Sequence, residues 1–501
     1  MRWTFIRTLP DLGSGPAARN ARADARTNIL PLLCVVALVA LQAISAFAVE
    51  RVARTFAHTP AAGPYLGHLG YYLDPAYWGK ATDLIVLGAH FLEILALYGL
   101  YRLLPESRTP NLTKAFIAGG VAVMLTVSLS VRLTGLDSIL YIYFAKVANL
   151  ATAYHVPASF APLPADFALL QHVIPRILPS PYGPLWELFD RRLLAGTHSV
   201  AQAIFALKAA SAVALLAVFA TLLLLRLPMR LAALFFLNPA LYDNYVVRAH
   251  NDLFAILPVL VALLLAKRRA FVVAALVASL AGLVKLSLVV IALATIASVG
   301  RLRTRLTSAA LIVAVLVLGS LLIGGSPYLH ALVFTERFLS QQNGSHATRN
   351  VRVALQMVLI AVGCVALVNA VLWRRVLRSA TWMFAGFSGL LHMWYFPWTI
   401  PFAIRFRVTA AALAITLPLF EIATDSQVAN VIKVSLELPT LLILAALGVT
   451  EFVRTKGRGE RSTAEAAEGT GYPQPLEATP SPGGLVGDFS PTATRWRRRE
   501  S

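Results

Sequence analysis

The sequence predicts an all-α protein that crosses a membrane many times. Of its 501 residues, 58% are hydrophobic and 14% are charged, and the mean hydropathy is +0.69. Soluble domains carry charge on about a quarter of their residues. Apolar runs long enough for a helix to cross a bilayer alternate with short clusters of Arg and Lys. These observations favour a polytopic membrane protein over a soluble domain with a single anchor.

The net charge of +20 is concentrated in the segments between the apolar runs. Because Arg and Lys accumulate in the cytoplasmic loops of membrane proteins, this charge indicates topology and the lipid bilayer as a partner, not nucleic acid. The two cysteines, Cys34 and Cys364, both lie inside apolar runs. The sequence therefore predicts neither a disulfide framework nor a thiolate metal site.

The charge rule orders the first part of the chain. Residues 1–28 carry five arginines and are expected to form a cytoplasmic segment before a membrane domain over 29–453. The first three spans are expected at 29–49, 84–104 and 115–131. After three crossings from a cytoplasmic N-terminus the chain is on the outer side, so residues 132–200 are expected to form a large outer loop.

The outer loop begins with a stretch that has helical periodicity. Leu140, Phe144 and Val147 fall on one stripe and Lys146 lies off it, the pattern of a helix in a membrane interface. A Pro-rich stretch and a second amphipathic piece after Gly183 follow. The loop is thus expected to carry interfacial helices.

The later spans are closely spaced. Single spans are expected at 203–225, 231–246, 252–266, 309–323, 353–373, 408–420 and 431–451, and helix pairs at 270–299 and 380–407. Residues 454–501 are rich in Gly, Pro, Ser, Thr and charge, which predicts a disordered cytoplasmic tail.

Lys285 explains why 270–299 is interpreted as two helices. A single helix would bury this lysine at mid-bilayer, at a cost of about 2.5–3.5 kcal/mol, and would place three following arginines outside. Two short helices turning near Lys285 return Arg301, Arg303 and Arg305 to the cytoplasm. The two-helix interpretation satisfies both constraints.

Unusual polar and aromatic residues fall at the outer ends of these spans. They are Asp137, Tyr182, Arg248, His250, Asn251, Asp252, Lys285, His392, Trp394, Tyr395 and Trp398. Ionisable groups at membrane turns are costly and usually face an internal cavity. The predicted topology places all of these residues at one depth in the membrane, as a single catalytic chamber at the outer leaflet would require.

Each of these residues also has a purely structural interpretation. Asp137 could N-cap a helix beginning at Ser138, and 250–252 could cap the helix that begins there. Lys285 could extend to the interface. Tyr182 could form a rigid turn between two prolines, and the Trp-Tyr run could be an aromatic belt.

Six short motifs follow one another within roughly 85–420. They are Asp137 in the large loop, Tyr182-Gly183-Pro184-Leu185, Asn238-Pro239, His250-Asn251-Asp252, Lys285 at a helix pair, and Trp394-Tyr395. Their order resembles that of the GT-C glycosyltransferases, and most closely the bacterial polyprenyl-phosphate-mannose-dependent mannosyltransferases. The resemblance implies a bundle of about 12–14 transmembrane helices whose large first outer loop is catalytic.

The resemblance also implies a reaction. A hexose, mannose in the first instance, would move from a polyprenyl-phosphate donor to a periplasmic or extracellular glycan or glycolipid by inverting single displacement. Asp137 would be the general base, and Lys285 and Arg248 would bind the donor phosphate. The remaining residues would contact the sugar or acceptor: Tyr182, His250, Asn251, Asp252, His392, Trp394, Tyr395 and Trp398.

The charge rule places both termini in the cytoplasm and these residues on the outer face, and the resemblance implies the inner (plasma) membrane. The sequence departs from the family pattern in two places: Leu136-Asp137-Ser138 carries one acid where relatives often carry two, and Lys146-Val147-Ala148 has no equivalent of their downstream Asp-Gly. That leaves open whether a divalent metal takes part.

Two other classes remain as alternatives. A transporter or lipid flippase predicts internal repeats and polar sites at the membrane midplane, whereas the polar groups here sit at the outer edge. A non-catalytic envelope scaffold would use the Pro-rich loop and basic tail as contact surfaces. Substrate-dependent release of polyprenyl phosphate separates the enzyme from both.

Overall fold

A computed structural model describes residues 16–57, 80–105, 109–131, 135–155, 162–168, 170–173, 179–296, 301–332, 398–403 and 407–425, with Thr450. All of them belong to Met1–Phe452, the larger of the two compact units into which the chain divides. Every regular element among the described residues is a helix. The all-α polytopic class predicted from composition is confirmed.

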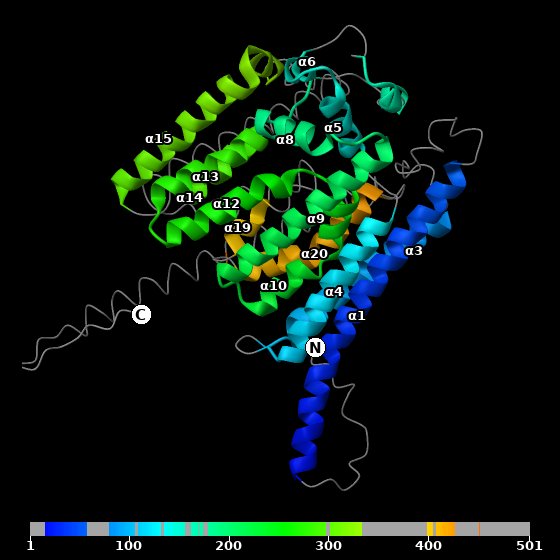
Figure 1. Ribbon diagram of the computed structural model, residues 1–501. Coiled ribbons are helices and arrows are strands. Elements are labelled where there is room, and N and C mark those ends of the chain that lie inside the picture. Colours follow the sequence, from blue (N-terminus) through cyan, green and yellow to red (C-terminus); the bar gives the residue numbers. More distant parts are fainter. Residues whose placement is uncertain are drawn as a thin grey trace, which may run out of the picture. The chain divides into compact units, whose positions relative to one another are not determined.

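Three long helices form one side of the membrane domain and lie alongside one another (Figure 1). They are α1 (Pro16–Ala57), α3 (Lys80–Leu103) and α4 (Asn111–Ser130). Gly120 of α4 lets this helix approach its neighbours, since a Cβ there would lie 2.8 Å from Leu237 and 2.9 Å from Val35. α1 begins at Pro16, inside the segment 1–28, and its part that is apolar enough to cross a membrane begins at Ile29, where the sequence placed the first span.

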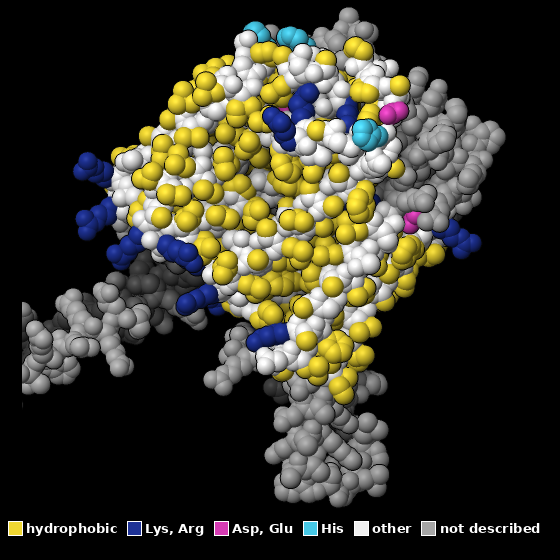
Figure 2. Space-filling view, viewed as in Figure 1, with side chains coloured by type: hydrophobic (Ala, Val, Ile, Leu, Met, Phe, Trp, Pro, Cys, Tyr) yellow, Lys and Arg dark blue, Asp and Glu magenta, His cyan; other side chains and the backbone are white. Residues whose placement is uncertain are grey.

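Five described helices are long and apolar enough to cross a membrane, or six if one bent pair is counted. They cover Ile29–Arg51, Leu84–Leu103, Asn111–Ser130, Val200–Leu224 and Leu302–Leu332. Their outward side chains are large and hydrophobic, and Figure 2 shows such side chains over much of the visible described surface. The predicted spans 353–373 and 431–451 and most of 380–407 lie outside the described residues, so the helix count stays a prediction.

The remaining membrane helices pack around a common core. α9 (Val200–Leu224) contacts α12 (Asp252–Lys267), and α20 (Arg407–Asp425), which follows α19 (Ile400–Ala403), contacts α3. α15 (Leu302–Gly319), continued by the π-helix η6 (Ser320–Gly324), lies against α13 (Phe271–Val284). α15 thus begins before residue 309, where the sequence placed the start of this span.

The single helix expected over 231–246 is wrong, because the chain breaks at Asn238-Pro239. It forms α10 (Met229–Phe236), α11 (Pro239–Tyr242) and the π-helix η4 (Asp243–Val247). Proline has no N–H to continue α10, and the Asn238 side chain accepts the N–H of Ala240 at 3.3 Å. The segment Pro239–Val247 then meets α12 at 114°.

The break predicted at Lys285 is confirmed. α13 (Phe271–Val284) ends there, and Lys285 adopts an extended backbone before the short η5 (Leu286–Leu288) and α14 (Val289–Ile296). Lys285 therefore lies at a helix end and not in the middle of a continuous apolar helix.

The described part of the loop 132–200 is largely helical. It contains α5 (Leu136–Lys146), α6 (Leu150–Tyr154), η3 (Ala165–Phe167), α7 (Leu170–Val173) and α8 (Pro184–Leu194). α5 packs against α8 and α9, and side chains on several sides of it are buried. Lys146, expected on its polar face, donates to the carbonyls of Leu194 (2.7 Å) and Thr197 (3.0 Å).

The Pro-Tyr-Gly-Pro turn before α8 packs directly on the break at Lys285. The Gly183 N–H donates to the Val284 carbonyl at 2.9 Å. A Cβ at Gly183 would lie 2.0 Å from the Leu283 carbonyl oxygen, so this contact requires glycine. The turn thereby joins the loop 132–200 to the end of α13.

Replacing Gly183 with Ala should separate the turn from α13. Relieving a backbone overlap of this kind costs about 1–3 kcal/mol or more, and we expect a lower midpoint of thermal unfolding for the detergent-solubilised full chain. Gly196→Ala is the matched control, because a Cβ there meets nothing within 4 Å. Equal midpoints for the two variants would contradict the packing described.

Candidate functional site

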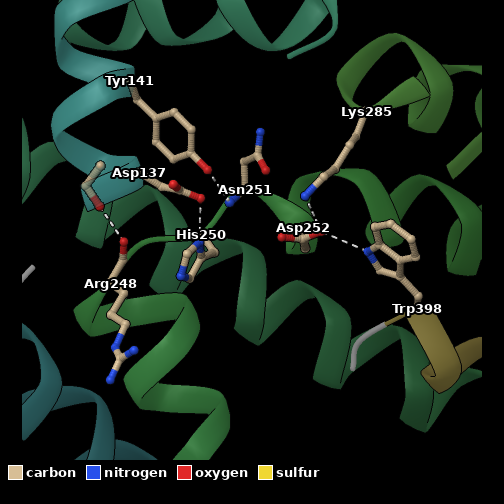
Figure 3. A network of polar contacts seen from close by, with 9 residues as sticks. Asp137, Tyr141, Arg248, His250, Asn251, Asp252, Lys285 and Trp398 are labelled. Atoms are coloured by element: carbon tan, nitrogen blue, oxygen red, sulfur yellow. Dashed lines mark hydrogen bonds and ion pairs between the residues drawn. The ribbon is translucent and has the colours of Figure 1, made fainter. Parts of the chain in front are cut away.

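The carboxylate of Asp137 points from the first turn of α5 toward a turn between η4 and α12 (Figure 3). The helix begins at Leu136 with Gly135 at the N-cap position, so the interpretation of Asp137 as an N-cap is wrong. Its Oδ2 lies 3.1 Å from Nδ1 of His250, and the two side chains are 29% and 6% exposed. An acid and a histidine distant in sequence thus form a pair at a partly open position.

The turn at 248–251 is held by backbone bonds from both sides. The N–H groups of Arg248 and His250 donate to carbonyls of η4, and the Ser138 hydroxyl donates to the Arg248 carbonyl. Ala249 has φ of 51°, a left-handed conformation that residues with a Cβ rarely adopt. This geometry directs His250 to Asp137, while Arg248 Nε lies 3.1 Å from Asp243 Oδ2.

Tyr141 connects α5 to the same turn, and sequence reasoning missed it. It is fully buried, and its hydroxyl accepts the backbone N–H of Asn251 at 3.3 Å. Its ring packs edge-on against Tyr182 at 4.8 Å and Trp186 at 5.0 Å. Burial raises the pKa of Tyr141, which keeps its hydroxyl neutral. Its position one helical turn after Asp137 was the available signal.

The second half of the site is built around Asp252. Its Oδ1 accepts both Lys285 Nζ and Trp398 Nε1, each at 2.8 Å. The Asp252 side chain is 1% exposed and that of Lys285 15%. Lys285 is therefore an ion-pair partner at the rim of the site, and the interpretation that it only extends to the interface is wrong. Its Nζ also lies 5.6 Å from the centroid of the Trp398 ring.

The structure brings most of the predicted residues together. Asp137, Arg248, His250, Asn251, Asp252, Lys285 and Trp398 appear in one view (Figure 3), and Tyr182 contacts them through Tyr141. Asn251 precedes α12 without a side-chain capping bond, so the capping interpretation does not hold for it. His392, Trp394 and Tyr395 lie outside the described residues.

Trp398 was expected to contact sugar or acceptor. It is 3% exposed, and its indole N–H is bonded to Asp252. This geometry makes it a support for the Asp252–Lys285 pair.

A second group of buried ionisable residues lies on α8 and was not expected from the sequence. Glu187 and Asp190 are both fully buried, and Ser180 donates a hydrogen bond to Glu187. Arg191 donates to the carbonyls of Phe144, Val147 and Asn149. Burial raises the pKa of Glu187 to about 7 and raises that of Asp190 well above its ordinary range. Trp186, the residue before Glu187, packs its ring edge-on against Tyr141.

Because the pKa of Glu187 is raised in the folded protein, Glu187 favours the folded state at low pH more than at high pH. A carboxyl that holds its proton more tightly when folded stabilises the protein at low pH, and this stabilisation is lost as pH rises from its ordinary 4.5 to about 7. The expected slope is about 1.4 kcal/mol per pH unit. Glu187→Gln should flatten this part of the thermal-stability profile, whereas exposed Asp166→Asn should leave it unchanged. Superimposable profiles for wild type and Glu187→Gln would refute the assignment.

Within the described part of the chain, no three His, Cys, Asp or Glu residues are placed to hold a metal ion. The site combines a carboxylate beside a histidine, Asp137 and His250, with a lysine bound to a second carboxylate, Asp252, two residues after that histidine. This combination can accept a proton at one end and contact an anion at the other.

The fold and site define a polytopic membrane protein with a polar site built on helix ends. Residues 140–301 match the family model described as Alpha-(1->6)-mannopyranosyltransferase, N-terminal domain. The match confirms the predicted resemblance to the GT-C mannosyltransferases over this range and supports a membrane glycosyltransferase. The matched range includes Tyr141, the 250–252 turn and Lys285, and begins just after Asp137. No curated protein and no solved structure matches the chain.

Proposed function

We propose that this glycosyltransferase moves a mannosyl residue from a polyprenyl-phosphate donor to a glycan or glycolipid acceptor at the outer face of the plasma membrane. The observation that carries the proposal is one site with a partly exposed carboxylate–histidine pair at one side and a lysine at the other. The mannopyranosyltransferase description of the matched family supports mannose as the sugar.

Asp137 acts as the general base in this proposal. The acceptor hydroxyl gives its proton to the Asp137 carboxylate while its oxygen forms a bond to the anomeric carbon. The bond between that carbon and the phosphate oxygen breaks, and its electron pair leaves with the phosphate. One displacement inverts the anomeric configuration. His250, 3.1 Å from Asp137, orients the carboxylate.

The donor phosphate is held by Lys285, with Arg248 as a second candidate. The Lys285 ammonium donates to Asp252 Oδ1 at 2.8 Å, and its side chain is 15% exposed, so a phosphate oxygen can approach it. A cation there offsets the charge that develops on the leaving phosphate. Trp398 keeps Asp252 aligned beneath Lys285, and the prenyl chain extends into the bilayer beside the apolar helices.

Replacing Asp137 with Asn should abolish transfer with little effect on folding. We expect kcat to fall by about 10²–10⁴-fold, the usual contribution of a general base, in purified protein given radiolabelled polyprenyl-phosphate mannose and a glycan acceptor. Release of polyprenyl phosphate is the measurement. Asp166→Asn, an exposed acid of the same loop, is the control. Retained activity in Asp137→Asn would remove this residue from the base role, and movement of lipid without release would favour a transporter.

Trp398→Phe should weaken use of the donor while keeping an aromatic ring at this position. The variant removes one hydrogen bond to an ionised Asp252, worth about 1.5–3 kcal/mol, and we expect kcat/KM for the donor to fall about 10–100-fold. Trp186→Phe is the matched control, because the buried Trp186 N–H has no hydrogen-bond partner to lose. Equal losses in the two variants would mean that indole packing, not the bond to Asp252, matters.

A further inference from the structure

The side chain of Asn251 lies between the two halves of the site. Its neighbours in sequence are His250, which pairs with Asp137, and Asp252, which binds Lys285. Figure 3 shows its amide directed into the space between Tyr141 and Lys285. Asn251 is fully buried, and neither its side-chain oxygen nor its side-chain nitrogen has a hydrogen-bond partner.

A buried amide with two unsatisfied atoms is unusual. More than about 90% of buried polar groups in proteins are hydrogen-bonded, and an exception needs a specific reason. The surrounding groups already have other partners: the Tyr141 hydroxyl accepts the backbone N–H of Asn251, and Asp252 Oδ1 accepts Lys285 and Trp398. The second oxygen of Asp252, Oδ2, is also buried without a hydrogen-bond partner. One donor group and two acceptor atoms are thus left unused at the same place.

We propose that the Asn251 amide, with Asp252 Oδ2, binds hydroxyl groups of the sugar that is transferred, and that Asn251 determines donor specificity. The inference rests on the proposed function, because it takes Asp137 as the base and Lys285 as the phosphate partner. In a direct displacement the transferred sugar lies between the attacking oxygen and the leaving phosphate. Asn251 occupies the corresponding position between Asp137 and Lys285.

The chemistry of the amide selects hydroxyls over the other parts of the substrates. A hydroxyl donates and accepts, which matches the N–H groups and oxygen of an amide, whereas an ionised phosphate diester only accepts. Asp252 Oδ2 is an acceptor and would repel a phosphate oxygen. The partly exposed side chains of Asp137 and Lys285 lie on either side of Asn251 and mark the approach to it.

A panel of donors tests the assignment. The full chain is given polyprenyl-phosphate mannose and analogues that each lack one ring hydroxyl, and kcat/KM is measured for each. A site built to bond a hydroxyl rejects the analogue lacking it strongly. For the wild type we expect at least one analogue to be about 100-fold worse than the parent donor. In Asn251→Ala, the same analogue should come within about tenfold of the parent.

The matched control is Asn244→Ala. Asn244 is also a buried asparagine, but its amide donates to the Ala240 carbonyl of its own helical segment. This variant should keep the wild-type discrimination. Because discrimination is a ratio within one preparation, partial misfolding lowers both rates and leaves the ratio unchanged. If Asn251→Ala yields no protein, isosteric Asn251→Asp replaces it and should also lose discrimination, since it has no N–H to donate.

Two results would overturn the inference alone: a wild type that accepts every analogue as well as the parent, or an Asn251 variant that keeps full discrimination. The second would mean that a buried water satisfies the amide. A wild type that transfers no sugar from any donor would instead overturn the proposed function itself.

Discussion

The ion pair between Asp252 and Lys285 is the interaction on which the rest of the site depends. An ionisable side chain near the membrane interior is tolerated when it has a partner, and breaking one member of a buried pair is strongly destabilising. Asp252 stands at the start of α12 and Lys285 at the end of α13, so the pair fixes two helix ends against each other. Trp398, from a much later part of the chain, adds a third connection.

The position of this pair determines what lies around it. Because Lys285 interrupts the helix, the carbonyls at the end of α13 become available, and Gly183 of the loop 132–200 bonds to one of them. α8 follows that glycine, and Trp186 of α8 packs on Tyr141 of α5, the helix that carries Asp137. The acid on α5 and the lysine at the helix break are therefore connected through packed rings and a backbone hydrogen bond, which fits the positioning that the proposed single displacement requires.

The sequence predicted those features that follow from the cost of charge in a membrane. Lys285 had to interrupt its helix, and this break is present. The same rule predicted a common depth for Asp137, His250 and Lys285, and the structure places their side chains in one polar network. The direct contact between Asp137 and His250 could not be predicted, because it depends on the left-handed turn at Ala249. Pro239 was a clear signal that the helix breaks at Asn238-Pro239. The apolar run 231–246 is long enough for a single span, however, and its length favoured the wrong prediction.

Other features were missed because side-chain chemistry alone does not reveal them. Tyr141 resembles any core aromatic residue in sequence, and its role depends on the tertiary contact to Asn251. Glu187 and Asp190 look like the polar face of an amphipathic helix, yet both are buried. For α8, burial is decided by the neighbouring helices and not by the periodicity of its own sequence.

The central claim is that the transferred sugar sits between Asp137 and Lys285. Cryo-electron microscopy of the full chain with an unreactive polyprenyl phosphonate of mannose tests it most directly. We expect a phosphonate oxygen within hydrogen-bonding distance of Lys285 Nζ, and Asp137 on the opposite side of the anomeric carbon. A phosphonate bound away from Lys285, or an Asp137 on the same side as the phosphonate, would contradict it.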